Sequence, residues 1–194
     1  FLLLVVSLAS ALFQILSTVP LYFREEIGLR EDAIGVLLSI NALLIVAFEM
    51  VLIHLVQKRD RLLLSAVGAF ILCLGLGILP FGHSLVYVVL TICIWTVGEM
   101  LSLPILNVIA GERSERGRRG QYMGLYTMAY SIAFVTAPIT GTWIYSRFGA
   151  DSLWHAILGL GVLLAAGFLM LRKPLERAST TSQPVLAPPP RESL

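Results

Sequence analysis

Six long apolar segments alternate with short polar ones along this chain. The apolar segments are residues 1–23, 33–56, 62–81, 84–110, 121–145 and 152–171. Each is long enough to cross a hydrocarbon core of about 30 Å as an α-helix. None of them alternates apolar with polar residues at a period of two, as a half-buried strand would. The pattern therefore predicts an all-α membrane protein with six transmembrane helices.

The composition supports the same class. Hydrophobic residues make up 57% of the 194 residues and charged residues only 13%, against about 25% charged in ordinary soluble domains. The net charge of +2 is too small to indicate a nucleic-acid partner. Cys73 and Cys93 lie in apolar runs without other ligand-type residues at metal spacing, and no catalytic set is visible. We therefore expect no metal, no cofactor and no enzymatic activity.

Residues 1–172 hold all six apolar segments and are expected to form one transmembrane domain. Residues 173–194 are rich in Pro, Ser and Thr, and we expect them to form a disordered tail. Phe1 begins inside an apolar stretch and no signal peptide is visible. We therefore expect the chain to be a piece of a longer one.

Basic residues are distributed unevenly between the two sets of connecting segments. The segments after the second and fourth apolar runs, together with the tail, carry eleven Lys and Arg residues, and the other three segments carry three. Basic segments face the cytoplasm in multi-pass proteins. The pattern predicts a cell-membrane protein whose two ends are both cytoplasmic.

Polar side chains recur at helical spacing in four of the six segments. They are Ser7, Ser10, Gln14 and Ser17; Asn41 and Glu49; Thr91, Trp95, Glu99 and Ser102; and Tyr122, Tyr126 and Tyr130. Because polar groups are costly in hydrocarbon, these stripes should face one another or a watery cavity. The third and sixth segments carry few polar residues and are expected to face lipid on most sides. Two polar segments followed by an apolar one, twice over, indicate two three-helix repeats of the kind found in secondary transporters.

Three stretches are similar to a known family. They are Arg118-Arg119-Gly120-Gln121-Tyr122-Met123-Gly124, the run from Ala133 to Gly141 that contains Pro138, and Arg147-Phe148-Gly149. With them, residues 1–172 resemble the C-terminal six-helix half of a major facilitator superfamily (MFS) transporter, particularly its proton-coupled drug-efflux branch. A family loop motif is only partly kept: Asp60-Arg61 is present, whereas Val56 and Leu63 replace its glycines. The resemblance implies half of a twelve-helix fold whose N-terminal six helices are missing here.

Glu49 and Glu99 lie well inside apolar segments. A carboxylate there costs about 2.5–3.5 kcal/mol on insertion scales, which favours a functional reason for its presence. A desolvated carboxyl group can bind and release a proton near neutral pH. We predict that these two residues couple transport to protons or contact the substrate. The alternative is a neutral glutamic acid that holds neighbouring helices together through a hydrogen bond.

Five further residues are predicted to line a substrate cavity: Gln14, Asn41, Trp95, Tyr126 and Tyr130. The alternative for the first three is a hydrogen bond or packing between helices, and for the tyrosines packing alone. A gating salt bridge is predicted to join Asp60 to Arg118 or Arg119, and the alternative is a solvated loop that sets the topology.

Together these features predict a secondary transporter, and most specifically a proton antiporter for multidrug efflux of small amphipathic compounds. Its partners would be the substrate, protons, the lipid bilayer and the N-terminal half. One alternative is an uptake carrier for a sugar, organic acid or peptide. An alternative of another class is a membrane scaffold or sensor that transports nothing.

Overall fold

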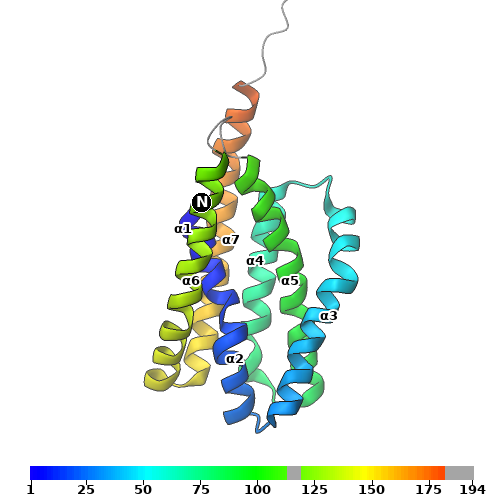
Figure 1. Ribbon diagram of the computed structural model, residues 1–194, viewed down its shortest axis with the longest axis vertical. Helices are drawn as coiled ribbons and strands as arrows, with labels where there is room; N and C mark the ends of the chain where they lie inside the picture. The colour runs from blue at the N-terminus through cyan, green and yellow to red at the C-terminus, as the bar shows by residue number, and fades with distance from the viewer. Residues whose placement is uncertain (113–118, 182–194) are drawn as a thin grey trace, which may run out of the picture.

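The computed structural model describes residues 1–112 and 119–181, with the backbone alone for residues 119 and 173–181. Within these ranges the chain is helical and contains no strand. The helices are α1 (Leu2–Leu12), α2 (Gln14–Glu25), α3 (Glu31–Val56), α4 (Arg61–Gly77), the short 3-10 helix η1 (Leu79–Phe81), α5 (Leu85–Glu112), α6 (Arg119–Phe148) and α7 (Ala150–Thr181). The all-α prediction is confirmed, and the helices form one upright bundle (Figure 1).

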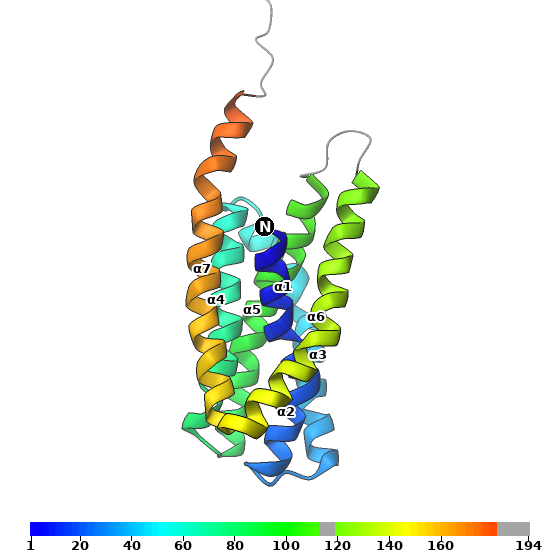
Figure 2. The ribbon, with the colours of Figure 1, turned by 90° about the vertical axis from the view of Figure 1, so that its left-hand side faces the viewer.

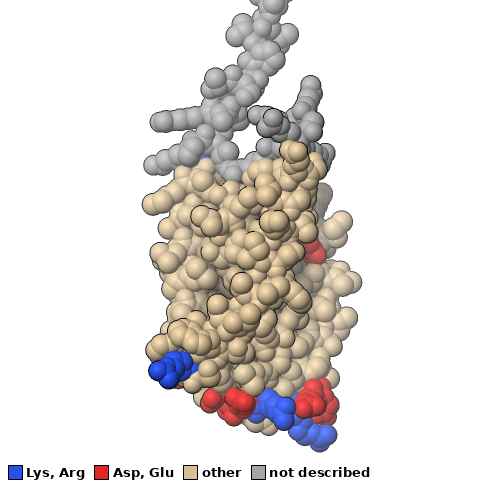
Figure 3. Space-filling model, turned by 60° about the vertical axis from the view of Figure 1, so that its left-hand side comes forward, with Lys and Arg blue, Asp and Glu red and all other residues tan. Residues whose placement is uncertain are grey.

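Five helical stretches are long and apolar enough to cross a membrane: Leu2–Glu25, Glu31–Val56, Arg61–Phe81, Leu85–Glu112 and Ala150–Arg172. Helix α6 runs along the same bundle (Figure 2) but is less apolar, because Tyr, Thr and Ser recur through it. The space-filling view in Figure 3 shows a broad band with few charged side chains, whereas Lys, Arg, Asp and Glu gather at the lower end. This distribution suits a bundle that crosses a bilayer.

The first apolar segment forms one spanning stretch, Leu2–Glu25, as predicted, with a tight turn at Phe13 between α1 and α2. Leu16 donates its backbone N–H to the Phe13 carbonyl at 3.3 Å, a tighter turn than an α-helix makes. The Phe13 ring packs edge-on against Tyr130 and Phe134 of α6, with ring centroids 6.4 and 5.2 Å apart. No proline or glycine stands at the break, so the local sequence gave no signal for it.

Helix α4 is the most enclosed of the spanning stretches, contrary to the expectation that it faces lipid on most sides. Of its most apolar stretch, 61% is buried, because α4 lies between α5 and α7 (Figures 1 and 2). A Cβ added at Gly68 would lie 2.8 Å from the backbone nitrogen of Ser102, and one at Gly75 would press against Trp95. Small residues thus allow the α4 and α5 backbones to approach closely.

Helix α3 is the least enclosed, with only 6% of its most apolar stretch buried. It packs mainly along α5 and stands at the edge of the bundle (Figure 1). Most of its apolar side chains are therefore unpartnered within the described residues.

The connection from α3 to α4, the end of α5 and the start of α6 lie at one end of the bundle, and α7 extends from that end (Figure 1). This is the end that the sequence predicts to be basic. Helix α7 continues to Thr181, so the segment predicted as a disordered tail, 173–194, begins inside a helix. Its remainder, residues 182–194, lies outside the described residues.

Candidate functional site

A hydrogen-bonded polar cluster joins α3 to α5. The side-chain amide nitrogen of Asn41 donates to Glu99 Oε2 at 2.8 Å and to Thr96 Oγ1 at 2.8 Å. Thr96 in turn donates to the Ile92 carbonyl of its own helix at 2.6 Å, which fixes its hydroxyl proton. The Asn41 amide therefore acts as the hydrogen-bond donor to both Thr96 and Glu99. It holds the Glu99 carboxyl group in place between α3 and α5.

Glu49 lies eight residues after Asn41 on the same helix and lines the neighbouring cleft. Both side chains are half-buried. Within the described part of the chain, neither carboxyl group has an ion-pair partner.

A cleft of about 820 Å³, counting its open mouth, lies where α3, α5 and α6 converge. Its lining consists of Glu49 from α3, Leu103, Pro104 and Asn107 from α5, and Tyr126, Thr127 and Tyr130 from α6. The structure thus brings Glu49 together with both predicted tyrosines. The Tyr126 hydroxyl donates to that of Tyr130 at 3.3 Å, and the ring centroids are 5.2 Å apart.

Gln14 lies away from this cleft, in the contact between α2 and α6. It is 4% exposed, donates to the Ala137 carbonyl at 2.9 Å and accepts from the Thr18 hydroxyl. Gly141 faces it, and a Cβ there would overlap the Gln14 amide. These contacts match the alternative interpretation, a hydrogen bond that holds helices together.

Trp95 also lies away from the cleft. It is completely buried against Gly75 in the contact between α4 and α5. Its indole N–H has no hydrogen-bond partner within the described residues. The geometry is that of packing between helices.

The predicted gating residues are only partly described. Asp60 Oδ2 lies 2.8 Å from Arg172 Nε of α7, and Asp60 Oδ1 caps α4 by accepting from the Leu63 backbone N–H at 2.9 Å. Arg61 pairs with Glu112 of α5. Arg118 lies outside the described residues and the Arg119 side chain is not described, so their predicted pairing with Asp60 stays a prediction.

Sequence reasoning missed Thr96, Asn107 and Thr127 as members of the site. Thr96 precedes Glu99 by three residues and Asn107 follows it by eight, spacings that place them near the same face of a helix. That signal was available, but isolated Thr and Asn residues are common in membrane helices. Within the described ranges, no three His, Cys, Asp or Glu side chains come together as a metal site would require.

Residues 1–192 match the Major Facilitator Superfamily. The chain is 24% identical over 169 residues to the uncharacterized MFS-type transporter YttB of Bacillus subtilis, covering 86% of this chain and 43% of that protein. It is 23% identical over 139 residues to the B. subtilis MFS-type transporter YqjV, covering 71% and 34%. It is 26% identical over 167 residues to a probable L-galactonate transporter of Escherichia coli, covering 86% and 37%.

The chain spans less than half the length of each of these relatives. No solved structure matches it. The family match nonetheless extends along almost the whole chain and agrees with the apolar helices and the polar groups between them. The chain therefore belongs to the Major Facilitator Superfamily of membrane transporters.

Proposed function

We propose that this chain is the C-terminal six-helix half of a proton-coupled antiporter that exports small amphipathic compounds across the cell membrane. The observation that carries the proposal is the pair of carboxyl groups on α3 and α5. Glu99 is held by Asn41, and Glu49 lines the aromatic cleft.

The two acids have different surroundings, which gives them different roles. Glu99 is fixed by a hydrogen bond to its Oε2 atom, whereas Glu49 opens onto the cleft. A proton that arrives at the pair removes the negative charge available to a bound substrate, and substrate that occupies the cleft hinders protonation of Glu49. This competition would let protons move inward as substrate moves outward.

The cleft lining favours amphipathic substrates. Leu103 and the two tyrosine rings offer apolar and aromatic surface for a flat molecule, or for a cation above a ring face. Asn107 and Thr127 add hydrogen-bonding groups at the same surface. A purely polar solute would gain little from such a lining.

The unpartnered face of α3 supports the presence of a second half. A large part of its apolar surface is uncovered, and the cleft is open on one side. We infer that the N-terminal six helices close the cleft, that substrate binds between the halves near the midplane, and that the basic end with the C-terminus faces the cytoplasm.

The test is substitution of each acid in the full-length transporter, assayed in everted membrane vesicles. Glu99→Gln should abolish substrate-dependent proton flux, because the amide cannot take up a proton. Glu49→Gln should weaken both substrate binding and proton flux. Glu31→Gln is the control, because Glu31 is an exposed acid at the start of α3. Unchanged proton flux in Glu99→Gln would refute the coupling role, and absence of any wild-type transport would favour a scaffold or sensor.

An uptake carrier is the second candidate, because one relative is named as a probable L-galactonate transporter. An anionic substrate would favour a cation within the membrane, but the Arg residues of the described helices stand at or near the ends of the spanning stretches. Uptake of a sugar acid by this protein would then depend on cations from the other half. Transport assays with a sugar acid and an organic cation separate the two candidates.

A further inference from the structure

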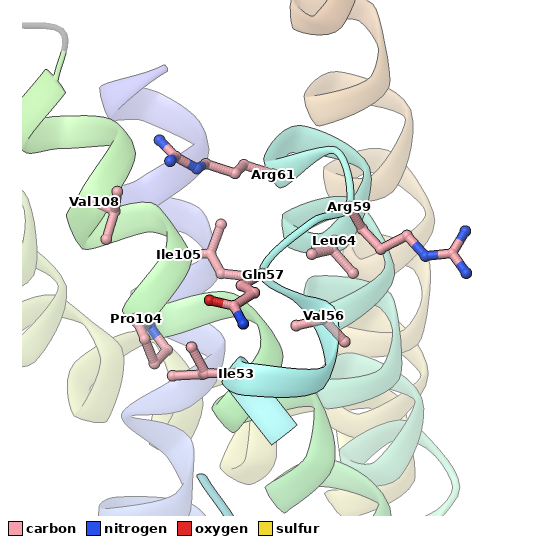
Figure 4. A pocket seen from close by; sticks show the side chains of 9 residues that line it. All are labelled: Ile53, Val56, Gln57, Arg59, Arg61, Leu64, Pro104, Ile105 and Val108. Atoms are coloured by element: carbon pink, nitrogen blue, oxygen red, sulfur yellow. The ribbon is translucent and has the colours of Figure 1, made fainter. Parts of the chain in front are cut away.

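The two walls of the cleft differ in what adjoins them. Pro104 of the α5 wall also lines a second pocket, of about 590 Å³ counting its open mouth, together with Ile53 and Gln57 (Figure 4). Tyr130 of the α6 wall instead packs against Phe13, an aromatic ring that is not part of the cleft lining. The α5 wall thus adjoins a further pocket, whereas the α6 wall is supported by a packed ring.

The backbone of Phe13 is fixed at the turn between α1 and α2. Its N–H donates to the Ala9 carbonyl at 2.9 Å. Its carbonyl accepts from the Leu16 N–H at 3.3 Å and from the Ser17 hydroxyl at 2.9 Å. Hydrogen bonds on both sides of the residue therefore set the direction in which the Phe13 side chain leaves the turn.

The turn is also attached to α6. Gln14, the next residue, donates to the Ala137 carbonyl at 2.9 Å, and the Phe13 ring packs edge-on against Tyr130 and Phe134. Tyr130, Phe134 and Ala137 follow one another at steps of four and three, so they share one face of α6. The backbone that carries the Phe13 ring cannot move away from Tyr130 without loss of the Gln14 bond, which is costly because that bond is buried.

Tyr130 is held from two directions. The Phe13 ring meets it with centroids 6.4 Å apart and planes at 89°, and the Tyr126 hydroxyl donates to its hydroxyl at 3.3 Å. A change of rotamer at Tyr130 would break both contacts. A ring face that is held in advance costs a ligand less ordering entropy on binding. A flat molecule that stacks on Tyr130 therefore gains from this arrangement.

We propose that Phe13 is a positioning residue that fixes the Tyr130 ring and thereby favours flat aromatic substrates over bulky ones. The inference rests on the proposed function, because it takes the cleft as the substrate site. Phe13 acts through Tyr130 rather than by contact with the substrate. Without the Phe13 ring, Tyr130 can turn, so flat substrates lose a prepared stacking surface and bulky ones gain room.

The experiment measures the binding of ethidium and tetraphenylphosphonium to the full-length transporter in detergent by equilibrium dialysis. Both cations carry a single charge, but ethidium has a flat ring system and tetraphenylphosphonium is a bulky propeller. Phe13→Ala should weaken ethidium binding roughly twofold to tenfold, the range expected for one edge-to-face aromatic pair. It should leave tetraphenylphosphonium binding unchanged or tighter. Phe13→Tyr keeps the ring and should retain the wild-type ratio of the two affinities.

A double-mutant cycle with Tyr130→Ala tests whether Phe13 acts through Tyr130. In the Tyr130→Ala background, Phe13→Ala should change the ratio of the two affinities no further. Phe148→Ala is the matched control, because Phe148 is an exposed ring at the end of α6 and does not line the cleft. It should leave the ratio unchanged. If Phe13→Ala does not fold, Phe13→Leu tests the same step, because leucine keeps apolar volume without the ring.

Two failures can be distinguished. If the wild-type protein binds neither cation, the proposed function is contradicted and this inference falls with it. If the wild-type protein binds both but Phe13→Ala weakens them equally, the positioning role is refuted while the proposed function stands. The same conclusion follows if Phe13→Ala shifts the ratio as much in the Tyr130→Ala background as in the wild type.

Discussion

The two sides of this bundle differ in how closely their helices pack. On one side α4 lies against α5 and α7, with Gly68, Gly75 and Gly98 at the contacts between α4 and α5. On the other side α3 and α6 flank an open cleft, and α3 buries little of its apolar surface. The acids, the paired tyrosines and Asn107 all lie on the open side.

This difference indicates that the two sides of the bundle have different roles. Close backbone contacts in the α4–α5–α7 side provide van der Waals attraction, which is the main stabilising term between helices in lipid. The open side keeps polar groups beside a space that a substrate can enter. Substitutions on the first side should therefore change stability, and substitutions on the second should change transport.

Among the variants that test this comparison, Asn41→Ala is expected to have the largest effect, measured as proton-coupled transport in everted vesicles. The change removes the hydrogen bond that holds Glu99 Oε2, and bonds to charged groups contribute about 1.5–3 kcal/mol. We expect a loss of roughly tenfold to a hundredfold in transport. Ser39→Ala is the matched control, because Ser39 is exposed and bonds only to the Gly35 carbonyl of its own helix. An equal loss of transport in both variants would contradict the proposal that Asn41 acts by holding Glu99.

Gly98→Ala tests the closely packed side. A Cβ at this position would overlap the Leu72 backbone of α4, and overpacking of this kind costs about 1–3 kcal/mol. We expect a lower thermal unfolding temperature in detergent. Gly124→Ala of α6 meets nothing within 4 Å and should be neutral or slightly stabilising, because alanine favours a helix. An unchanged unfolding temperature in Gly98→Ala would contradict the comparison between the two sides.

Gln14→Ala should destabilise the contact between α2 and α6 without direct effect on the cleft. It removes the donor to the Ala137 carbonyl and the acceptor for Thr18. Hydrogen bonds between membrane helices contribute about 0.6 kcal/mol on average, so a total loss of about 1 kcal/mol is expected. Chemical denaturation measures it. If the variant kept its stability but lost substrate binding, the result would support the prediction that Gln14 lines the substrate cavity.

The smallest effect is expected at the basic end, for Asp60→Asn. Asparagine keeps the cap of α4 but loses the ion pair with Arg172, whose side chain is 41% exposed. Half-exposed pairs contribute about 0–1 kcal/mol, and less in high salt. Asp60→Ala loses the cap as well, at a further cost of about 1 kcal/mol. Unfolding of the two variants at low and high salt separates the cap from the ion pair.

The sequence predicted the helical class and the long apolar stretches, because length and hydropathy are local properties. It also singled out Glu49, Glu99 and Asn41, because polar groups in an apolar run are conspicuous, but their roles stay predictions. It did not predict the break at Phe13, which coincides with ring packing against α6. Nor did it predict that Arg172 is the partner of Asp60, because these residues are distant in the chain.

By itself, then, the sequence determined which segments are helices and which of their faces carry polar groups. Only the tertiary structure decided which helix each face meets. Asn41 donates to Glu99 of α5, whereas Gln14 contacts α6 and Trp95 packs against α4. The same holds for α4, whose apolar surface meets α5 and α7. The physical reason is that lipid and a helix interface are equally apolar, so hydropathy cannot distinguish them, whereas close contact between two backbones depends on both helices at once.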